Sequence, residues 1–163
     1  MPTACLLAVC LHLVNVSSAS PATVAAAEHD VAAMYASIGV PIRWTDDADA
    51  MLLIVRDDEP GTLRRASQPI LGVAIRAAQG SPAAYVFYRR AAAQAERDSV
   101  PAATVIAAAM AHEIGHLLLP ASGHAHRGLM RACWDHDDLV NAARGDLRFS
   151  PEQAASIRAI VGR

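Results

Sequence analysis

The sequence predicts an α/β (α+β) fold in which a sheet packs against helices. Apolar segments of strand length alternate with segments of helical periodicity, in the order strand, helix, four strands, long helix, irregular segment and terminal helix. The 163 residues, 53% of them hydrophobic and 18% charged, are enough for one domain with a substantial core. We therefore expect residues 1–163 to form a single domain.

The charge and hydropathy of the chain argue against nucleic acid or a membrane as a partner. The formal net charge is −2, from 14 basic and 16 acidic side chains, and no long run of one sign occurs. Beyond residues 1–16, no segment is long and apolar enough to span a membrane. We expect a monomer that binds no nucleic acid and has no membrane span.

The three cysteines, Cys5, Cys10 and Cys133, indicate little about the redox compartment. Their number is odd and no C-x-x-C spacing occurs, so neither a disulfide framework nor a thiolate zinc site is well supported. One bridge, for example between Cys10 and Cys133, stays open, but free thiols are favoured.

The apolar N-terminal segment, residues 1–16, allows two interpretations. Residues 16–20 (Val-Ser-Ser-Ala-Ser) resemble the small-residue cleavage region of a signal peptide. However, no Lys or Arg precedes the apolar stretch, and His12 and Asn15 are unusual within one. A buried first strand over residues 8–16 is therefore favoured.

A helix is predicted after this strand. Ser20 is an N-cap and Pro21 occupies the first helical position, while Gly39 is a typical C-terminal residue. Between them, one apolar face is formed by residues that recur at helical spacing: Val24, Ala27, Val31, Met34, Tyr35 and Ile38.

Four strands are predicted next, at residues 41–45, 51–55, 70–75 and 84–88. The second is a continuous apolar run, and the fourth is rich in aromatic and β-favouring residues. The acidic residues beside the second strand lack an ordered ligand spacing, which favours a solvated loop over a calcium site. These residues are Asp46, Asp47, Asp49, Asp57 and Asp58.

The C-terminal half is predicted to be mainly helical. A short helical turn is expected at residues 91–97, and a long helix bounded by prolines at 101–119. Residues 121–148 carry few regular signals. A last helix is expected over residues 150–161, with Gln153 placed for a capping box.

An H-E-x-x-H motif lies inside the predicted long helix, at residues 112–116. His112 and His116 are four residues apart, so both side chains lie on one helix face and can occupy two corners of a tetrahedral zinc site. Glu113 follows the first ligand, where it can act on a zinc-activated water without binding the metal. The alternative is a chance match that leaves two solvated histidines.

Zinc needs a third protein ligand, and His124 is the first histidine after the helix. Pro120 ends the helix, and Gly123 can supply a positive φ just before His124. Residues 128–130 (Gly-Leu-Met) then predict a tight turn that places Met130 beneath the metal.

On these residues the sequence resembles the metzincin clan of zinc peptidases, most closely the matrixins, and more closely still small bacterial metzincin-like proteins. The likeness is carried by residues 112–116, His124, residues 128–130 and Trp134. It implies a twisted, five-stranded, mostly parallel sheet with an antiparallel edge strand, packed on two long helices. Met130 would be the methionine of the Met-turn, and Trp134 a packing residue.

The resemblance also implies how the domain is divided. An N-terminal subdomain over about residues 8–119 would contain the sheet and the active-site helix, and a C-terminal subdomain over about 120–163 the third ligand and the terminal helix. Substrate would lie along the edge strand that begins at Leu71 and ends at Ile75. A secreted or extracytoplasmic location is favoured by the resemblance alone.

The third ligand is where this chain departs from the clan. The clan's pattern, H-E-x-x-H-x-x-G-x-x-H, has glycine where this chain has Leu119 and histidine where it has Ser122. The third histidine comes two residues later, so the turn must be wider. His126 is an alternative ligand. A downstream carboxylate is another, from Asp135, Asp137 or Asp138.

The sequence thus predicts a zinc-dependent endopeptidase in which His112, His116 and His124 hold one catalytic Zn²⁺. Glu113 would be the general base that takes a proton from the zinc-activated water. The substrate would be an extended peptide or protein segment. Two alternatives stay open: a catalytically inactive zinc-binding protein that acts as an interaction module, and a zinc hydrolase with a carboxylate as third ligand.

Overall fold

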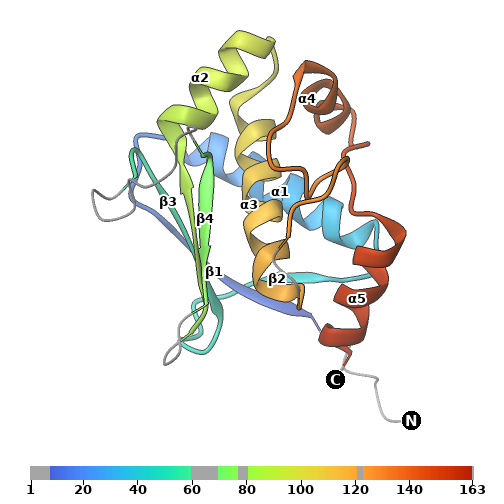
Figure 1. Ribbon diagram of the computed structural model, residues 1–163. Helices are drawn as coiled ribbons and strands as arrows, with labels where there is room; N and C mark the ends of the chain where they lie inside the picture. The colour runs from blue at the N-terminus through green and yellow to red at the C-terminus, as the bar shows by residue number, and fades with distance from the viewer. Residues whose placement is uncertain (1–7, 60–69, 77–80, 121–122, 163) are drawn as a thin grey trace.

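Five strands form one sheet with α1 and α3 packed on one face, in a computed structural model that describes residues 8–59, 70–76, 81–120 and 123–162 (Figure 1). The strands are β1 (Val9–Asn15), β2 (Ile42–Trp44), β3 (Met51–Arg56), β4 (Gly72–Ile75) and β5 (Ala83–Phe87). The helices are α1 (Pro21–Ala36), α2 (Tyr88–Asp98), α3 (Ala102–Leu118), α4 (His136–Ala143) and α5 (Pro151–Val161).

The sheet has the strand order β2-β1-β3-β5-β4. β1 is parallel to β2 and β3, and β3 is parallel to β5. β4 pairs antiparallel with β5 and forms one edge of the sheet. The predicted fold class, a mostly parallel five-stranded sheet with an antiparallel edge strand, is confirmed. The parallel pair β1 and β2 is joined through α1, the kind of crossover that parallel strands require.

The N-terminal segment enters the sheet as β1, which lies between β2 and β3. Val9 and Leu11 are buried, whereas Cys10 and His12 between them are only partly buried, so alternate side chains face the helices. The strand interpretation is confirmed for Val9–Asn15. Residues 1–7 lie outside the described residues.

Helix α1 begins as its capping residues predict. The Ser20 side chain accepts a hydrogen bond from the Thr23 amide, and the chain turns out of the helix at Gly39, where φ is +74°. Tyr35 is fully buried, and its hydroxyl donates a hydrogen bond to the Ala111 carbonyl at 3.0 Å. This bond joins α1 to α3 directly before the H-E-x-x-H motif.

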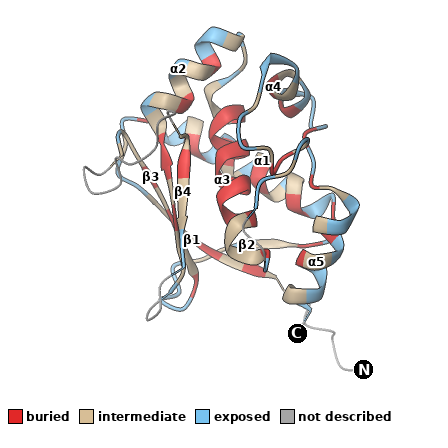
Figure 2. Cartoon of the chain, viewed as in Figure 1, coloured by how far each residue is buried: buried red, intermediate tan, exposed pale blue. Residues whose placement is uncertain are grey.

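Helix α3 is the most deeply buried helix of the protein (Figure 2). Every residue from 104 to 115 is buried, because α1, α2 and the strands β4 and β5 all pack against it. Its small residues, chiefly alanine, allow this close approach. The motif at residues 112–116 therefore lies on a helix held from several sides.

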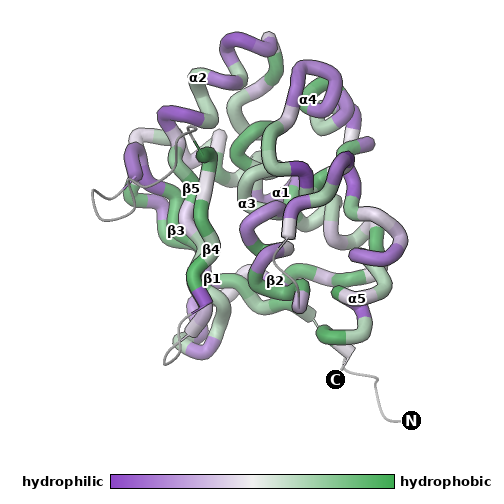
Figure 3. The backbone as a smooth tube through the Cα atoms, in the orientation of Figure 1, coloured by the Kyte–Doolittle hydropathy of each residue, from purple (hydrophilic) through white to green (hydrophobic). Residues whose placement is uncertain are grey.

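Helices α2 and α4 differ from what the sequence indicates. Helix α2 starts at Tyr88, directly after β5, and is longer than the short turn expected at residues 91–97. Helix α4 was not predicted. It is short and begins with a hydrophilic turn (Figure 3). Its capping box was readable: the Asp135 side chain accepts a hydrogen bond from the Asp138 amide, and the Asp138 side chain accepts one from the Asp135 amide.

Two further predictions concern the terminal helix and the cysteines. Helix α5 begins with the expected capping box of Ser150 and Gln153. Cys10 and Cys133 are free thiols, so the bridge between them that the sequence left open is not formed, and Cys5 lies outside the described residues. Within the described ranges, no helix is long and apolar enough to cross a membrane.

Candidate metal centre

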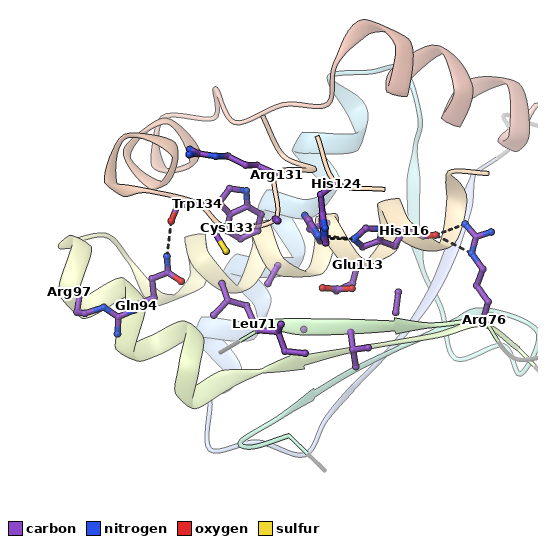
Figure 4. Close-up of a pocket in the computed structure, with 17 residues that line it drawn as sticks. Leu71, Arg76, Gln94, Arg97, Glu113, His116, His124, Arg131, Cys133 and Trp134 are labelled. Carbon is purple, nitrogen blue, oxygen red and sulfur yellow. Dashed lines mark hydrogen bonds between the residues drawn. The ribbon is translucent and has the colours of Figure 1, made fainter. Parts of the chain in front are cut away.

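Three histidine side chains converge above α3 (Figure 4). The Nε2 atom of His116 lies 2.9 Å from Nε2 of His112 and 3.3 Å from Nε2 of His124. One ring nitrogen from each residue lies within 4.8 Å of the others. Tetrahedral zinc with nitrogen ligands at 2.0–2.1 Å places those nitrogens about 3.4 Å apart. The group could therefore hold a metal ion of this kind.

The orientation of His112 is fixed by the turn that follows His124. Its Nδ1 lies 2.8 Å from the Leu129 carbonyl oxygen, so the Nδ1–H donates and Nε2 keeps its lone pair for the centre of the group. Burial, the largest cause, lowers the pKa of His112 to about 4. At neutral pH this imidazole is thus neutral, the form that binds metals.

His116 is half-buried, and its pKa is also lowered, first by burial and then by His124 and Arg76. Arg76 follows β4 and its Nε donates to the His116 carbonyl at 3.2 Å, while another guanidinium nitrogen donates to the Leu119 carbonyl. These carbonyls end α3 and carry the negative end of its dipole. Arg76 therefore joins the edge strand to the C-terminus of the metal-site helix. No spacing rule in the sequence pointed to it.

His124 is the histidine that joins the pair on α3, and His126 does not. His126 is exposed. Asp135 and Asp138 cap α4, and both bind Arg131. Within the described part of the chain, neither His126 nor any carboxylate belongs to the group.

A positive φ occurs after His124, at Gly128, where φ is +78°. A turn that reverses the direction of the chain follows His124. The Arg131 amide donates to the Gly128 carbonyl at 3.1 Å and the Ala125 amide to the Met130 carbonyl at 2.7 Å, which closes the turn. Ser122 lies outside the described residues.

Met130 lies on this turn and is fully buried against α3. A Cβ atom built on Gly115 would be 2.7 Å from the Met130 sulfur and 3.0 Å from the Phe149 ring. The absence of a side chain at Gly115 thus leaves room for Met130 to pack against the helix next to His116. The tight turn with a buried methionine agrees with the sequence expectation.

Glu113 extends from α3 toward the edge strand (Figure 4). A Cβ atom on Gly72 would be 2.8 Å from the Glu113 Cγ, so the strand backbone lies directly against this side chain. Burial raises the pKa of Glu113 to about 8, and a hydrogen bond from the Ala74 amide opposes that rise. A cation held by the histidines would also favour the ionised carboxylate.

A cavity of about 650 Å³ lies between β4, α3 and the segment after the turn (Figure 4). Glu113 and the three histidines line it, and Trp134 forms part of the opposite wall. The Trp134 ring meets the His112 ring edge to face, with centroids 5.6 Å apart, which agrees with a packing role. The cavity continues past Leu71 to α2.

No protein-family model matches the sequence, and no curated protein matches it. A solved structure described as the GM1 bound form of the ECX AB5 holotoxin is similar in fold, with a TM-score of 0.53 and 11% sequence identity. The match covers 96% of this chain and 81% of that chain. At this identity the likeness shows the fold alone, and the three-histidine group on that fold could hold a metal ion.

Proposed function

We propose that this protein is a zinc-dependent endopeptidase of the metzincin type, with His112, His116 and His124 as zinc ligands and Glu113 as the general base. The observation that carries the proposal is the convergence of three imidazole nitrogens beside a buried carboxyl on one wall of a cavity. A structural zinc site is usually closed by four protein ligands, whereas three ligands facing a cavity leave a coordination position open.

A zinc ion bound there would polarise a substrate carbonyl and lower the pKa of a water molecule. Glu113 would take the proton of that water as its oxygen attacks the scissile carbonyl, because the carboxyl lies beside the histidines and accepts a hydrogen bond from the Ala74 amide. The same carboxyl would then give the proton to the amine nitrogen as the C–N bond breaks. Burial disfavours the charged carboxylate and so makes Glu113 a better proton acceptor than an exposed glutamate.

The edge strand β4 suits an extended peptide substrate. The Phe87 amide donates to the Leu71 carbonyl at 2.8 Å, so the N–H and C=O groups of Leu71 and of every second residue after it point toward β5. The N–H and C=O groups of Gly72 and Ala74 point the other way, toward the unpaired edge of β4. The Gly72 groups and the Ala74 carbonyl can therefore pair with a substrate main chain beside Glu113.

The test is metal analysis combined with cleavage of a peptide library. The wild-type protein should contain one zinc ion per chain and hydrolyse internal peptide bonds. Glu113→Ala should keep the zinc and the fold but lose at least about 100-fold in kcat/KM, because it removes the base and no ligand. Glu152→Ala, an exposed glutamate on α5, is the control and should behave as wild type.

Two results would contradict the proposal. If purified wild-type protein takes up no zinc, the metal assignment fails. If Glu113→Ala hydrolyses peptides as fast as wild type, the mechanism is wrong. A protein that binds zinc tightly and cleaves no member of the library would instead support the alternative of an inactive, zinc-binding interaction module.

A further inference from the structure

The charged residues that line the cavity are mainly basic. Arg76, Arg97 and Arg131 line it, and Glu113 is the one carboxyl group among its described lining residues. A cavity lined by one sign of charge concentrates its field and attracts ligands of the opposite sign.

Two of the three guanidinium groups are already engaged. Arg131 donates to both Asp135 and Asp138, whose charges offset its own. Arg76 donates to carbonyls at the C-terminus of α3, where the helix dipole is negative. The guanidinium groups of Arg76 and Arg131 therefore stabilise the cavity walls and are not free to bind a ligand.

Arg97 is different, because no hydrogen bond or ion pair engages its side chain within the described part of the protein. It is exposed, and it lies on α2 three residues after Gln94, so the two side chains share one helix face. The Gln94 amide donates to the Trp134 carbonyl at 3.4 Å, which joins this face of α2 to the opposite wall. Figure 4 shows Gln94 and Arg97 at the end of the cavity remote from Arg76.

The residues just before the edge strand β4 also lie close to α2, the helix that carries Arg97. Arg90, also on α2, donates to the Ile70 carbonyl at 2.8 Å, so the start of β4 is held against α2. Ile70 and Leu71 line the cavity between Glu113 and Arg97. A peptide that pairs with β4 and continues past Leu71 therefore approaches Arg97, whereas a peptide continuing past Ile75 approaches Arg76.

We propose that Arg97, with Gln94 beside it, binds a carboxylate of the substrate and makes the enzyme prefer peptides that are acidic several residues from the scissile bond, on one side only. This inference rests on the proposed function. The carboxylate can come from an Asp or Glu side chain or from the C-terminus of the peptide. A guanidinium is well suited to either, because its planar donors match the two carboxylate oxygens.

The test compares matched peptides that carry Glu or Gln at successive positions on each side of the cleaved bond, each with a free or an amidated C-terminus. Wild type should cleave the favoured Glu peptide about threefold to tenfold faster in kcat/KM than its Gln partner, as expected for one partly exposed charge pair. Arg97→Gln should abolish the ratio by lowering kcat/KM for the Glu peptide toward the value for its Gln partner. Arg97→Glu should reverse it in favour of Lys peptides.

The control is Arg89→Gln, because Arg89 is on α2 but pairs with Asp58 and does not line the cavity. A preference that responds to the free C-terminus alone assigns the carboxylate to the chain end, and one that responds to Glu alone assigns it to a side chain. A Glu preference that persists in Arg97→Gln, or equal preferences on both sides of the scissile bond, overturns the inference.

The same peptides should be tested for binding to Glu113→Ala by fluorescence anisotropy, so that failure of this inference can be told apart from failure of the proposed function. If wild type cleaves nothing but Glu113→Ala binds the Glu peptide more tightly in an Arg97-dependent way, the peptidase function fails and the carboxylate site stands. If cleavage occurs with no charge preference, the carboxylate site fails and the peptidase function stands.

Discussion

The two walls of the cavity are built differently, although each supplies part of the histidine group. On one wall, His112 and Glu113 belong to α3, in which every residue from 104 to 115 is buried. On the other wall, His124 is exposed and lies in a segment outside any helix or strand. That segment is held by a few backbone hydrogen bonds around Gly128 and by the contact of Met130 with α3.

This difference indicates where the site is organised before a metal arrives. Residues fixed by packing on all sides keep their rotamers without a ligand. An exposed histidine loses side-chain conformational entropy when it binds the metal. The bond from His112 to the Leu129 carbonyl connects the two walls directly. Replacing a metal ligand on the buried wall should therefore affect both metal binding and folding, whereas replacing one on the exposed wall should affect metal binding alone.

The largest effect is expected for His112→Ala. It removes a ligand and leaves the Leu129 carbonyl without its donor, so zinc should be lost and the free energy of unfolding of the metal-free protein should fall by about 1–3 kcal/mol. Elemental analysis and urea denaturation of the metal-free proteins measure the two effects. Zinc retained at full stoichiometry would remove His112 from the ligand set.

His124→Ala should also lose zinc to a mild chelator, but the metal-free variant should unfold within about 0.5 kcal/mol of wild type, because the side chain is exposed. His126→Ala is the matched control, since His126 is two residues away and also exposed, and it should keep its zinc. The reverse pattern, with zinc lost only from His126→Ala, would show that His126 is the third ligand.

Gly115→Ala should have the smallest effect and should act on stability alone. The added methyl group would be 2.7 Å from the Met130 sulfur, which must move, so we expect a loss of about 1–2 kcal/mol in the free energy of unfolding with zinc still bound. Gly123→Ala is the control on the exposed wall, since among the described residues its Cβ would meet no atom within 4 Å. Equal free energies of unfolding for the two variants would mean that Met130 does not pack tightly against α3 at Gly115.

Much of the fold was predictable because it depends on local signals. The capping residues Ser20 and Ser150, the prolines around α3 and the apolar strands each act within a few residues of the chain. Helix α4 was missed for the complementary reason. It is too short for a repeating apolar face to stand out, and each of its capping residues, Asp135 and Asp138, is by residue type also an alternative third zinc ligand.

The sequence alone determined that His112 and His116 share a face, because a helix brings residues four apart together whatever surrounds it. It favoured His124 as the third ligand but left His126 open, since both follow the helix in an irregular segment. That choice depends on the turn at Gly128, which the Arg148 carbonyl holds through the Leu129 amide at 2.9 Å. Likewise, only the tertiary structure placed Arg76 on the end of α3 and Arg97 at the end of the cavity. Contacts between residues distant in the chain depend on the packing of whole elements, and no local pattern encodes them.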